Sequence, residues 1–134
     1  MHVLGVVGHS DTGKTTLLER LTDRLAERGR VATIKHGHAF DVDTEGKDTA
    51  RHRAAGATRT YGITDDGAWF ATGAGRTLRD LLESLAPDFD YALIEGYSDA
   101  DVSQVVLGGR DHAGETLASA PEADAVDVDA VVDA

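Results

Sequence analysis

The sequence contains no cysteine and only two prolines, one tryptophan and one methionine among its 134 residues. Without cysteine, disulfide bonds and thiolate metal sites are excluded, and any metal must be held by oxygen or imidazole, which favours a hard ion such as magnesium. No apolar run approaches the roughly 20 residues of a membrane span. The first residues lead directly into a strand-like segment, so we expect no secretory signal, no membrane partner and a cytoplasmic location.

Positive charge is also scarce. The formal net charge is −11, and lysine occurs only at positions 14, 35 and 47. Such a surface repels nucleic acid, so we expect no nucleic-acid partner. The many aspartates suggest, as a hypothesis, a protein adapted to a high-salt cytoplasm with an acidic proteome.

The opening of the chain predicts a strand–helix–strand unit. Residues 2–7 form a nearly continuous apolar run typical of a buried strand, and Leu17, Leu21 and Leu25 share one face of a helix over residues 14–28. A second apolar run at 30–34 completes a parallel, right-handed unit. Further along, we expect a loop at 35–47, helices at 48–55 and 77–86, a hairpin from strands 58–64 and 68–72, and strands at 91–94 and 102–107.

The segment GHSDTGKT at residues 8–15 fits the pattern G-x-x-x-x-G-K-[ST] between a predicted strand and a predicted helix. Backbone amides from Ser10 through Thr15 can wrap a phosphate chain, and the positive end of the helix faces it. Lys14 supplies a charge for the β- and γ-phosphates, and the Thr15 hydroxyl can reach a magnesium ion. The alternative is a glycine-rich turn with a solvated lysine.

Magnesium bound to phosphate requires an acid at the end of a neighbouring strand. Glu95 follows the apolar run Tyr91-Ala92-Leu93-Ile94 and occupies the position of such an acid. The alternative is an exposed loop residue.

The segment KHGHAFDVDTEGKD at residues 35–48 should leave the carboxyl edge of the sheet beside the phosphate loop. We interpret Asp41 or Asp43 as an outer-shell magnesium ligand or a base that orients water; Asp43 and Lys14 are thus the candidate catalytic residues. A zinc site formed by His36, His38 and Asp41 is an alternative, although its spacing matches no standard structural site.

No acid occurs between Thr49 and Thr64, so Arg51, Arg53 and Arg59 form a positive island. We interpret the island as an anion site for nucleotide phosphate, a second phosphorylated ligand or an acidic partner. The alternative is a helix that exposes arginines to solvent.

The three segments GHSDTGKTTLLERL, VATIKHGHAFDVDTEGKDTARHRAAGA and YALIEGY resemble, in this order, the molybdopterin-guanine dinucleotide biosynthesis protein B (MobB) family of P-loop proteins. The resemblance implies a GTP-binding homodimer with weak hydrolysis that assists the guanylyltransferase joining GMP to molybdopterin. It implies phosphate binding by Gly8, Ser10, Asp11, Thr12, Gly13, Lys14, Thr15 and Thr16, and metal binding by Thr15, Glu95 and Asp41. The loop or anion site of the family comprises Lys35, His36, His38, Lys47, Asp48, Arg51 and Arg53.

The expected fold is therefore α/β, a P-loop NTPase three-layer sandwich with a mixed, mainly parallel central sheet and a β-hairpin. Residues 1–110 form the predicted nucleotide-binding domain, and residues 111–134 form an acidic segment with edge strands at 116–120 and 125–128. Ser98 stands where the family usually has a lysine, and no guanine-specific Asn-Lys-x-Asp motif occurs, so GTP rests on the resemblance. The alternatives on this fold are a small-molecule kinase and a metallochaperone-type GTPase.

Overall fold

The computed structural model describes residues 1–9, 12–37 and 48–134. The chain forms two compact units, residues 1–37 with 82–134 and residues 38–81, and each is described by itself. Unit 1 contains β1 (His2–Gly8), α1 (Lys14–Ala26), β2 (Val31–Lys35), β5 (Tyr91–Glu95), β6 (Gln104–Leu107), β7 (Thr116–Ala120), the 3₁₀ helix η1 (Ala123–Ala125) and α4 (Val128–Asp133). Unit 2 contains α2 (Asp48–Ala54), β3 (Arg59–Ile63) and β4 (Trp69–Gly73), and α3 (Leu78–Leu85) spans the boundary.

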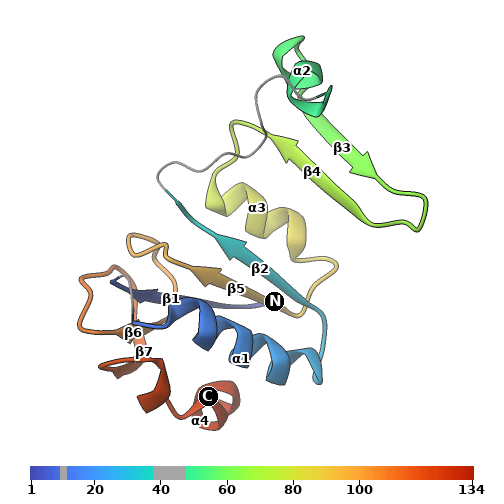
Figure 1. Cartoon of the computed structure of the whole chain (residues 1–134). Helices are drawn as coiled ribbons and strands as arrows, with labels where there is room; N and C mark the ends of the chain where they lie inside the picture. Colours follow the sequence, from blue (N-terminus) through green and yellow to red (C-terminus); the bar gives the residue numbers. More distant parts are fainter. Residues whose placement is uncertain (10–11, 38–47) are drawn as a thin grey trace. The chain divides into compact units, whose positions relative to one another are not determined.

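The strands of unit 1 form one five-stranded sheet in the order β2-β5-β1-β6-β7 (Figure 1). Every neighbouring pair in it is parallel, and the antiparallel pairing lies in the separate β3–β4 sheet. The predicted α/β class, with a mainly parallel sheet and a hairpin, is confirmed. Because parallel strands end at the same edge, the segments that follow β1, β2, β5 and β6 all begin at one edge of the sheet.

Helix α1 packs its leucine stripe against one face of this sheet. Leu17, Leu21 and Leu25 are buried, and they join a cluster that includes Leu93 of β5 and Leu107 of β6. The leucines on one face of α1 and the strand residues that point toward that face therefore pack together in one apolar core. This packing fixes the first turn of α1 at the carboxyl edge of the sheet.

On the other face, the buried side chain of Gln104 holds two loops. Its amide donates hydrogen bonds to the carbonyl oxygens of Ala100 and Ala113, each at 3.1 Å. A Cβ at Gly5 would lie 2.7 Å from the Gln104 Oε1 atom, so only glycine leaves room for this side chain. Gln104 therefore ties down the connection that runs from β5 to β6, which begins next to Glu95.

The acidic C-terminal segment folds onto α1. Residues 116–120 form the predicted edge strand, β7, but the strand predicted at 125–128 is wrong, because these residues end η1 and begin α4. The Asp127 carboxylate accepts a hydrogen bond from the Ala130 amide and caps α4. Three exposed ion pairs, here called the arginine ladder, join α1 to this segment. They are Arg20–Asp124 at 3.1 Å, Arg24–Asp129, and Arg28–Asp133 at 2.7 Å.

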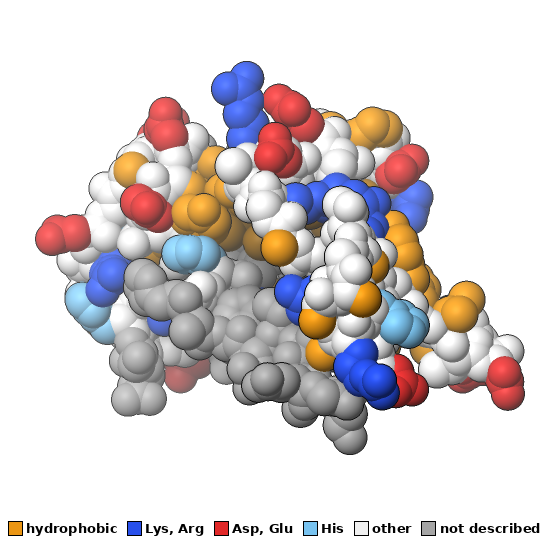
Figure 2. Space-filling model, turned by 90° about the horizontal axis from the view of Figure 1, so that it is seen from above, with side chains coloured by type: hydrophobic (Ala, Val, Ile, Leu, Met, Phe, Trp, Pro, Cys, Tyr) orange, Lys and Arg blue, Asp and Glu red, His pale blue; other side chains and the backbone are white. Residues whose placement is uncertain are grey.

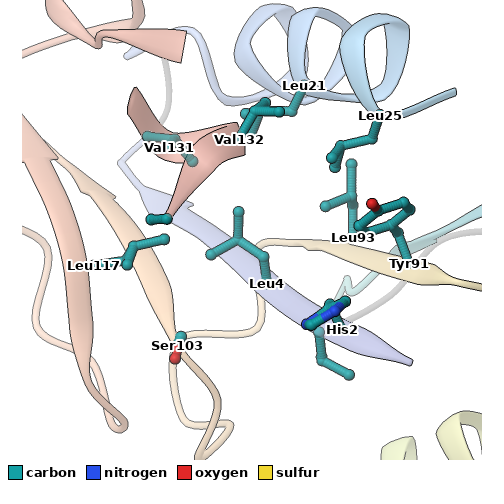
Figure 3. A pocket seen from close by; sticks show the side chains of 12 residues that line it. His2, Leu4, Leu21, Leu25, Tyr91, Leu93, Ser103, Leu117, Val131 and Val132 are labelled. Carbon is teal, nitrogen blue, oxygen red and sulfur yellow. The ribbon is translucent and has the colours of Figure 1, made fainter. Parts of the chain in front are cut away.

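A cavity of about 360 Å³ lies between α1, α4 and the sheet. Figure 3 shows Leu21 and Leu25 of α1, Leu4 of β1 and Val131 of α4 around it. The lining of this cavity is mostly apolar, so the cavity is part of the apolar core. Helix α4 covers this end of the core but does not fill it. The arginine ladder and the partial apolar contact together hold α4.

Unit 2 is built around the β3–β4 hairpin. Its register pairs Tyr61 with Ala71 and Ile63 with Trp69, and these side chains share one face. Tyr61, Ile63 and Trp69 are 58%, 77% and 69% exposed, so this face, here called the hairpin face, is mostly apolar and uncovered among the described residues; Arg59 at one end of it donates to the Tyr61 hydroxyl. In the turn, a hydrogen bond from the Thr64 hydroxyl lowers the pKa of the Asp66 carboxyl.

On the face drawn in Figure 2, acidic side chains appear at several separate places. Within the described part of the chain, no helix has the length and apolar character needed to cross a membrane.

Candidate functional site

The loop between β1 and α1 requires glycine at both of its ends. Gly13 has a φ of +88°, in the left-handed region that side chains disfavour. A Cβ there would also lie 2.8 Å from the Ala123 Cβ, and a Cβ at Gly8 would lie 2.6 Å from the Thr12 Oγ1 atom. The backbone therefore makes a tight turn into α1. The amides of the first turn of α1 have no hydrogen-bond partners within the helix.

Lys14 folds back over this loop. Its ammonium group donates a hydrogen bond to the Gly8 carbonyl oxygen at 2.8 Å. The loop is braced on its other side, where the Thr12 carbonyl accepts from the Ala123 amide at 3.0 Å. The positive charge of Lys14 thus lies beside the free backbone donors of the first turn of α1, and a cation next to such donors is an arrangement that binds phosphate groups.

Glu95 lies beside the first turn of α1. Its register opposite Val6 places it at the end of β5, and its Oε1 atom accepts a hydrogen bond from the Thr15 hydroxyl. Glu95 is only 5% exposed, so it is not the exposed loop residue of the alternative interpretation. A hydroxyl and a carboxylate are hard oxygen ligands, and this donor pair fits magnesium.

Three more residues lie at this edge, at or just after the ends of β2 and β5. They are the predicted site residues Lys35 and His36, and Tyr97. The Lys35 ammonium lies 3.8 Å from the Glu95 Oε2 atom, although its side chain is 72% exposed. The His36 amide donates to the Glu95 carbonyl at 3.0 Å, and the His36 ring stacks on Tyr97 with ring centroids 3.9 Å apart. Lys35 therefore lies beside the buried carboxylate, and His36 contacts the backbone of the same residue.

Thr15 and Glu95 open into a groove of about 520 Å³ between α1 and β2. Glu19 and Asp23 also line the groove, together with Thr33 of the edge strand. Glu19 and Asp23 are exposed and screened by solvent, whereas Glu95 is buried, so Glu95 is the acid of this groove that is positioned to bind a cation. The side of Thr15 and Glu95 that faces the groove is thus suited to a metal ion, while the phosphate loop offers the donors for an anion.

The predicted site residues divide into three groups. Gly8, Thr12, Gly13, Lys14, Thr15, Thr16, Glu95, Lys35 and His36 lie in unit 1 at the carboxyl edge of the sheet. Asp48, Arg51 and Arg53 lie on α2 in unit 2. Ser10, Asp11, His38, Asp41, Asp43 and Lys47 lie outside the described residues, as do two of the three ligands of the alternative zinc site.

Two contacts at this edge were missed by the sequence analysis. Tyr97 stacks on His36, and the Arg110 guanidinium lies 3.3 Å from the His9 Nδ1 atom of the phosphate loop. Tyr97 lies two residues after the end of β5 and Arg110 three residues after the end of β6, and a polar residue near the end of a parallel strand is the signal that identified Glu95. Among residues 1–9, 12–37 and 48–134, no group of three or more histidine and acidic side chains could hold a metal by itself.

The chain is similar to proteins of one family. The sequence profile described as molybdopterin guanine dinucleotide synthesis protein B matches residues 3–133. The molybdopterin-guanine dinucleotide biosynthesis adapter protein of Haemophilus influenzae is 35% identical over 129 residues, covering 91% of this chain and 69% of that protein. The adapter protein of Escherichia coli is 37% identical over 120 residues, covering 84% of this chain and 67% of that protein.

A longer relative and a solved structure extend the comparison. A Haloferax volcanii protein described as a probable molybdopterin synthase is 41% identical over 128 residues. The match covers 96% of this chain, but the chain spans only 44% of the length of that relative. The crystal structure of Bacillus subtilis MobB matches with a TM-score of 0.70 and 28% identity, covering 99% of this chain and 97% of that one.

Proposed function

Because the chain belongs to the molybdopterin guanine dinucleotide synthesis protein B (MobB) family, we propose that it is a GTP-binding accessory protein of molybdenum cofactor biosynthesis. It assists the guanylyltransferase that joins GMP to molybdopterin. The observation that carries this proposal is the constellation at the first turn of α1, where Lys14 covers the glycine-bounded loop and Thr15 bonds the buried Glu95.

Lys14 exchanges partners when nucleotide binds. Its hydrogen bond to the Gly8 carbonyl occupies the ammonium group in the free protein. The β- and γ-phosphate oxygens are stronger acceptors for a cation than a neutral carbonyl, so they take over this contact. The backbone amides of the loop, with the side chains of Thr12 and Thr16 at its end, surround the rest of the phosphate chain.

Thr15 and Glu95 would hold a magnesium ion, and Asp41 is the further proposed ligand. When bound, magnesium neutralises charge on the β- and γ-phosphates. The Thr15 hydroxyl and the Glu95 carboxylate are already adjacent, so these side chains lose little conformational entropy when the metal binds. Lys35 beside Glu95 keeps the buried carboxylate partly neutralised in the free protein.

Hydrolysis of the bound GTP is slow in this proposal, and the protein is at most a magnesium-dependent GTPase of low turnover. Asp43 remains the proposed residue that orients water, with Lys14 stabilising the phosphoryl group. Binding energy orders the segment after Lys35 and His36, and the ordered segment contacts the partner enzyme or molybdopterin. The site of action is the cytoplasm.

The hairpin face is the proposed homodimer contact. Tyr61, Ile63 and Trp69 form an exposed apolar surface on a two-stranded sheet, which is the kind of surface that a second copy covers. We expect Trp69→Ser to shift the protein to monomer in sedimentation experiments. Phe70→Ser, on the opposite face of the same strand and 51% exposed, should leave the dimer intact. A monomeric parent protein, or equal effects of both substitutions, contradicts this assignment.

One experiment separates the proposed function from its alternatives. The purified protein is titrated with GTP and with ATP in the presence of magnesium, and phosphate release is followed with and without the guanylyltransferase and molybdopterin. Preferred GTP binding, slow turnover and stimulation of the guanylyltransferase support an accessory protein. Rapid phosphate transfer to a small acceptor instead indicates a kinase.

A further inference from the structure

The charge of unit 2 differs from that of the rest of the chain. Its described part, residues 48–81, contains five arginines and four aspartates, whereas the whole protein has a net charge of −11. All four aspartates lie outside the segment between Thr49 and Thr64, which begins within α2 and includes β3. The segment between Thr49 and Thr64 is therefore a part of the chain in which an anionic ligand meets little repulsion.

A cavity of about 490 Å³ lies within unit 2, between α2, the residues that precede β3 and the end of β4. Arg53 and Thr58 are its polar lining residues. The rest of the lining consists of four alanines and one glycine, so no large side chain fills the space. Such a cavity accepts a small molecule with a flat apolar part, and its polar groups contact one end of that molecule.

Arg53 is half-buried, and its guanidinium makes no hydrogen bond or ion pair with the described residues. The other arginines of the positive island are used or placed differently. Arg59 donates to the Tyr61 hydroxyl at 3.0 Å, and Arg51 is exposed and does not line the cavity. A half-buried guanidinium in the wall of a cavity is a donor set for a planar or tetrahedral oxyanion.

Two buried hydroxyl groups lie on the same side of the hairpin. Thr60 and Thr72 are directly opposed across the strands, are 5% and 6% exposed, and their hydroxyls have no hydrogen-bond partner among the described residues. Thr60 and Thr72 do not line the cavity, but they lie two residues along the chain from its lining residues Thr58 and Ala74. Two unpaired buried hydroxyls are unusual, because buried polar groups are nearly always satisfied.

From these observations we propose that unit 2 contains a second anion site, centred on Arg53 and the cavity beside Thr58, that binds a small organic phosphate monoester. The guanidinium pairs with the phosphate, the Thr58 hydroxyl donates to one of its oxygens, and the alanines contact a flat ring. The inference deepens the proposed function: a dinucleotide contains a pyrophosphate, so the compound that receives GMP must itself bring a phosphate.

The test uses the full chain carrying Lys14→Ala, so that the phosphate loop does not compete for the probe. Phenyl phosphate is titrated at low salt, and the amide signals of Ala57, Thr58 and Gly73 are followed by NMR. We expect saturable shifts of these signals, at least tenfold weaker binding for Arg53→Gln, and less than a twofold change for Arg51→Gln, its exposed neighbour on the same helix.

A second variant covers the case in which Arg53→Gln unfolds α2. Ala54→Leu fills the cavity but keeps the guanidinium, and it should also weaken phenyl phosphate at least tenfold while the amide signals of α2 stay dispersed. Equal weakening by the Arg51 and Arg53 substitutions, or undiminished binding to Ala54→Leu, overturns the site. GTP binding by the parent protein is measured separately, so its failure would refute the proposed function alone.

Discussion

The substitution Glu95→Gln separates the metal-binding role of this residue from its structural role. The amide oxygen of glutamine can still accept the hydrogen bond from the Thr15 hydroxyl, so the contact between β5 and α1 remains. The lost ion pair with Lys35 contributes at most about 1 kcal/mol to stability, because the lysine is 72% exposed. The free energy of unfolding should therefore fall only slightly.

Metal-dependent nucleotide binding should change far more. Removing the charge of a ligand, or of the residue that orients one, typically weakens metal binding by about 10- to 100-fold, which is roughly 1.4–2.8 kcal/mol. We expect this loss in GTP titrations with magnesium and little change in titrations with EDTA. Isothermal titration calorimetry measures both affinities, and chemical denaturation gives the stability of the same samples.

Glu19→Gln is the matched control, because Glu19 is an exposed acid that lines the same groove. It removes the same charge without touching Thr15, so its GTP affinity should stay within about twofold of the parent, as expected for a screened surface charge. If Glu95→Gln and Glu19→Gln weakened magnesium-dependent binding equally, the assignment of Glu95 as a metal ligand would be refuted.

Three further perturbations test other parts of the structure. Gly13→Ala should weaken GTP binding and lower stability by at least about 1–2 kcal/mol, the cost of a left-handed alanine, in calorimetry and urea denaturation; unchanged values would contradict the loop geometry. The double substitution Arg20→Gln with Arg24→Gln in the arginine ladder should lower the free energy of unfolding by about 0–2 kcal/mol in dilute buffer and leave it unchanged in molar salt, where the ion pairs are screened. An equal loss of stability in both buffers would show that these arginines do not stabilise the fold through their charge. Thr64→Val should raise the pKa of Asp66 measured by NMR, because the Thr64 hydroxyl lowers that pKa in the folded parent. The parent should therefore be more stable than the variant at neutral pH, and this difference in stability should disappear as the pH falls through the folded pKa.

The first strand–helix–strand unit could be predicted because its patterns are long and regular. The leucine spacing of α1 gave its buried face, and the apolar runs gave β1, β2 and β5 within one or two residues. The C-terminal segment could not be predicted as well. Its short runs of alanine, valine and aspartate fit a strand or a helix equally, and the cap that decides between them, from Asp127 to the Ala130 amide, is a single hydrogen bond.

The site was predictable where a residue type directly follows a strand. Lys14, Thr15 and Glu95 lie at the same edge of the sheet because β1 and β5 are parallel neighbours whose ends lie close together. The two apolar runs in the sequence that predict these strands are enough to predict this placement. The stacking of His36 on Tyr97 depends on ring orientation, and the cavity beside Arg53 depends on how α2 packs on the hairpin. Neither leaves a periodic signal in the sequence.

The central claim is that Lys14 and its loop bind the triphosphate of GTP, and calorimetric titration of the parent protein and Lys14→Ala with magnesium and GTP tests it most directly. A charge-assisted hydrogen bond contributes about 1.5–3 kcal/mol, so the variant should bind roughly 10- to 150-fold more weakly while its circular dichroism spectrum is unchanged. Equal GTP affinity in the two folded proteins would contradict the account.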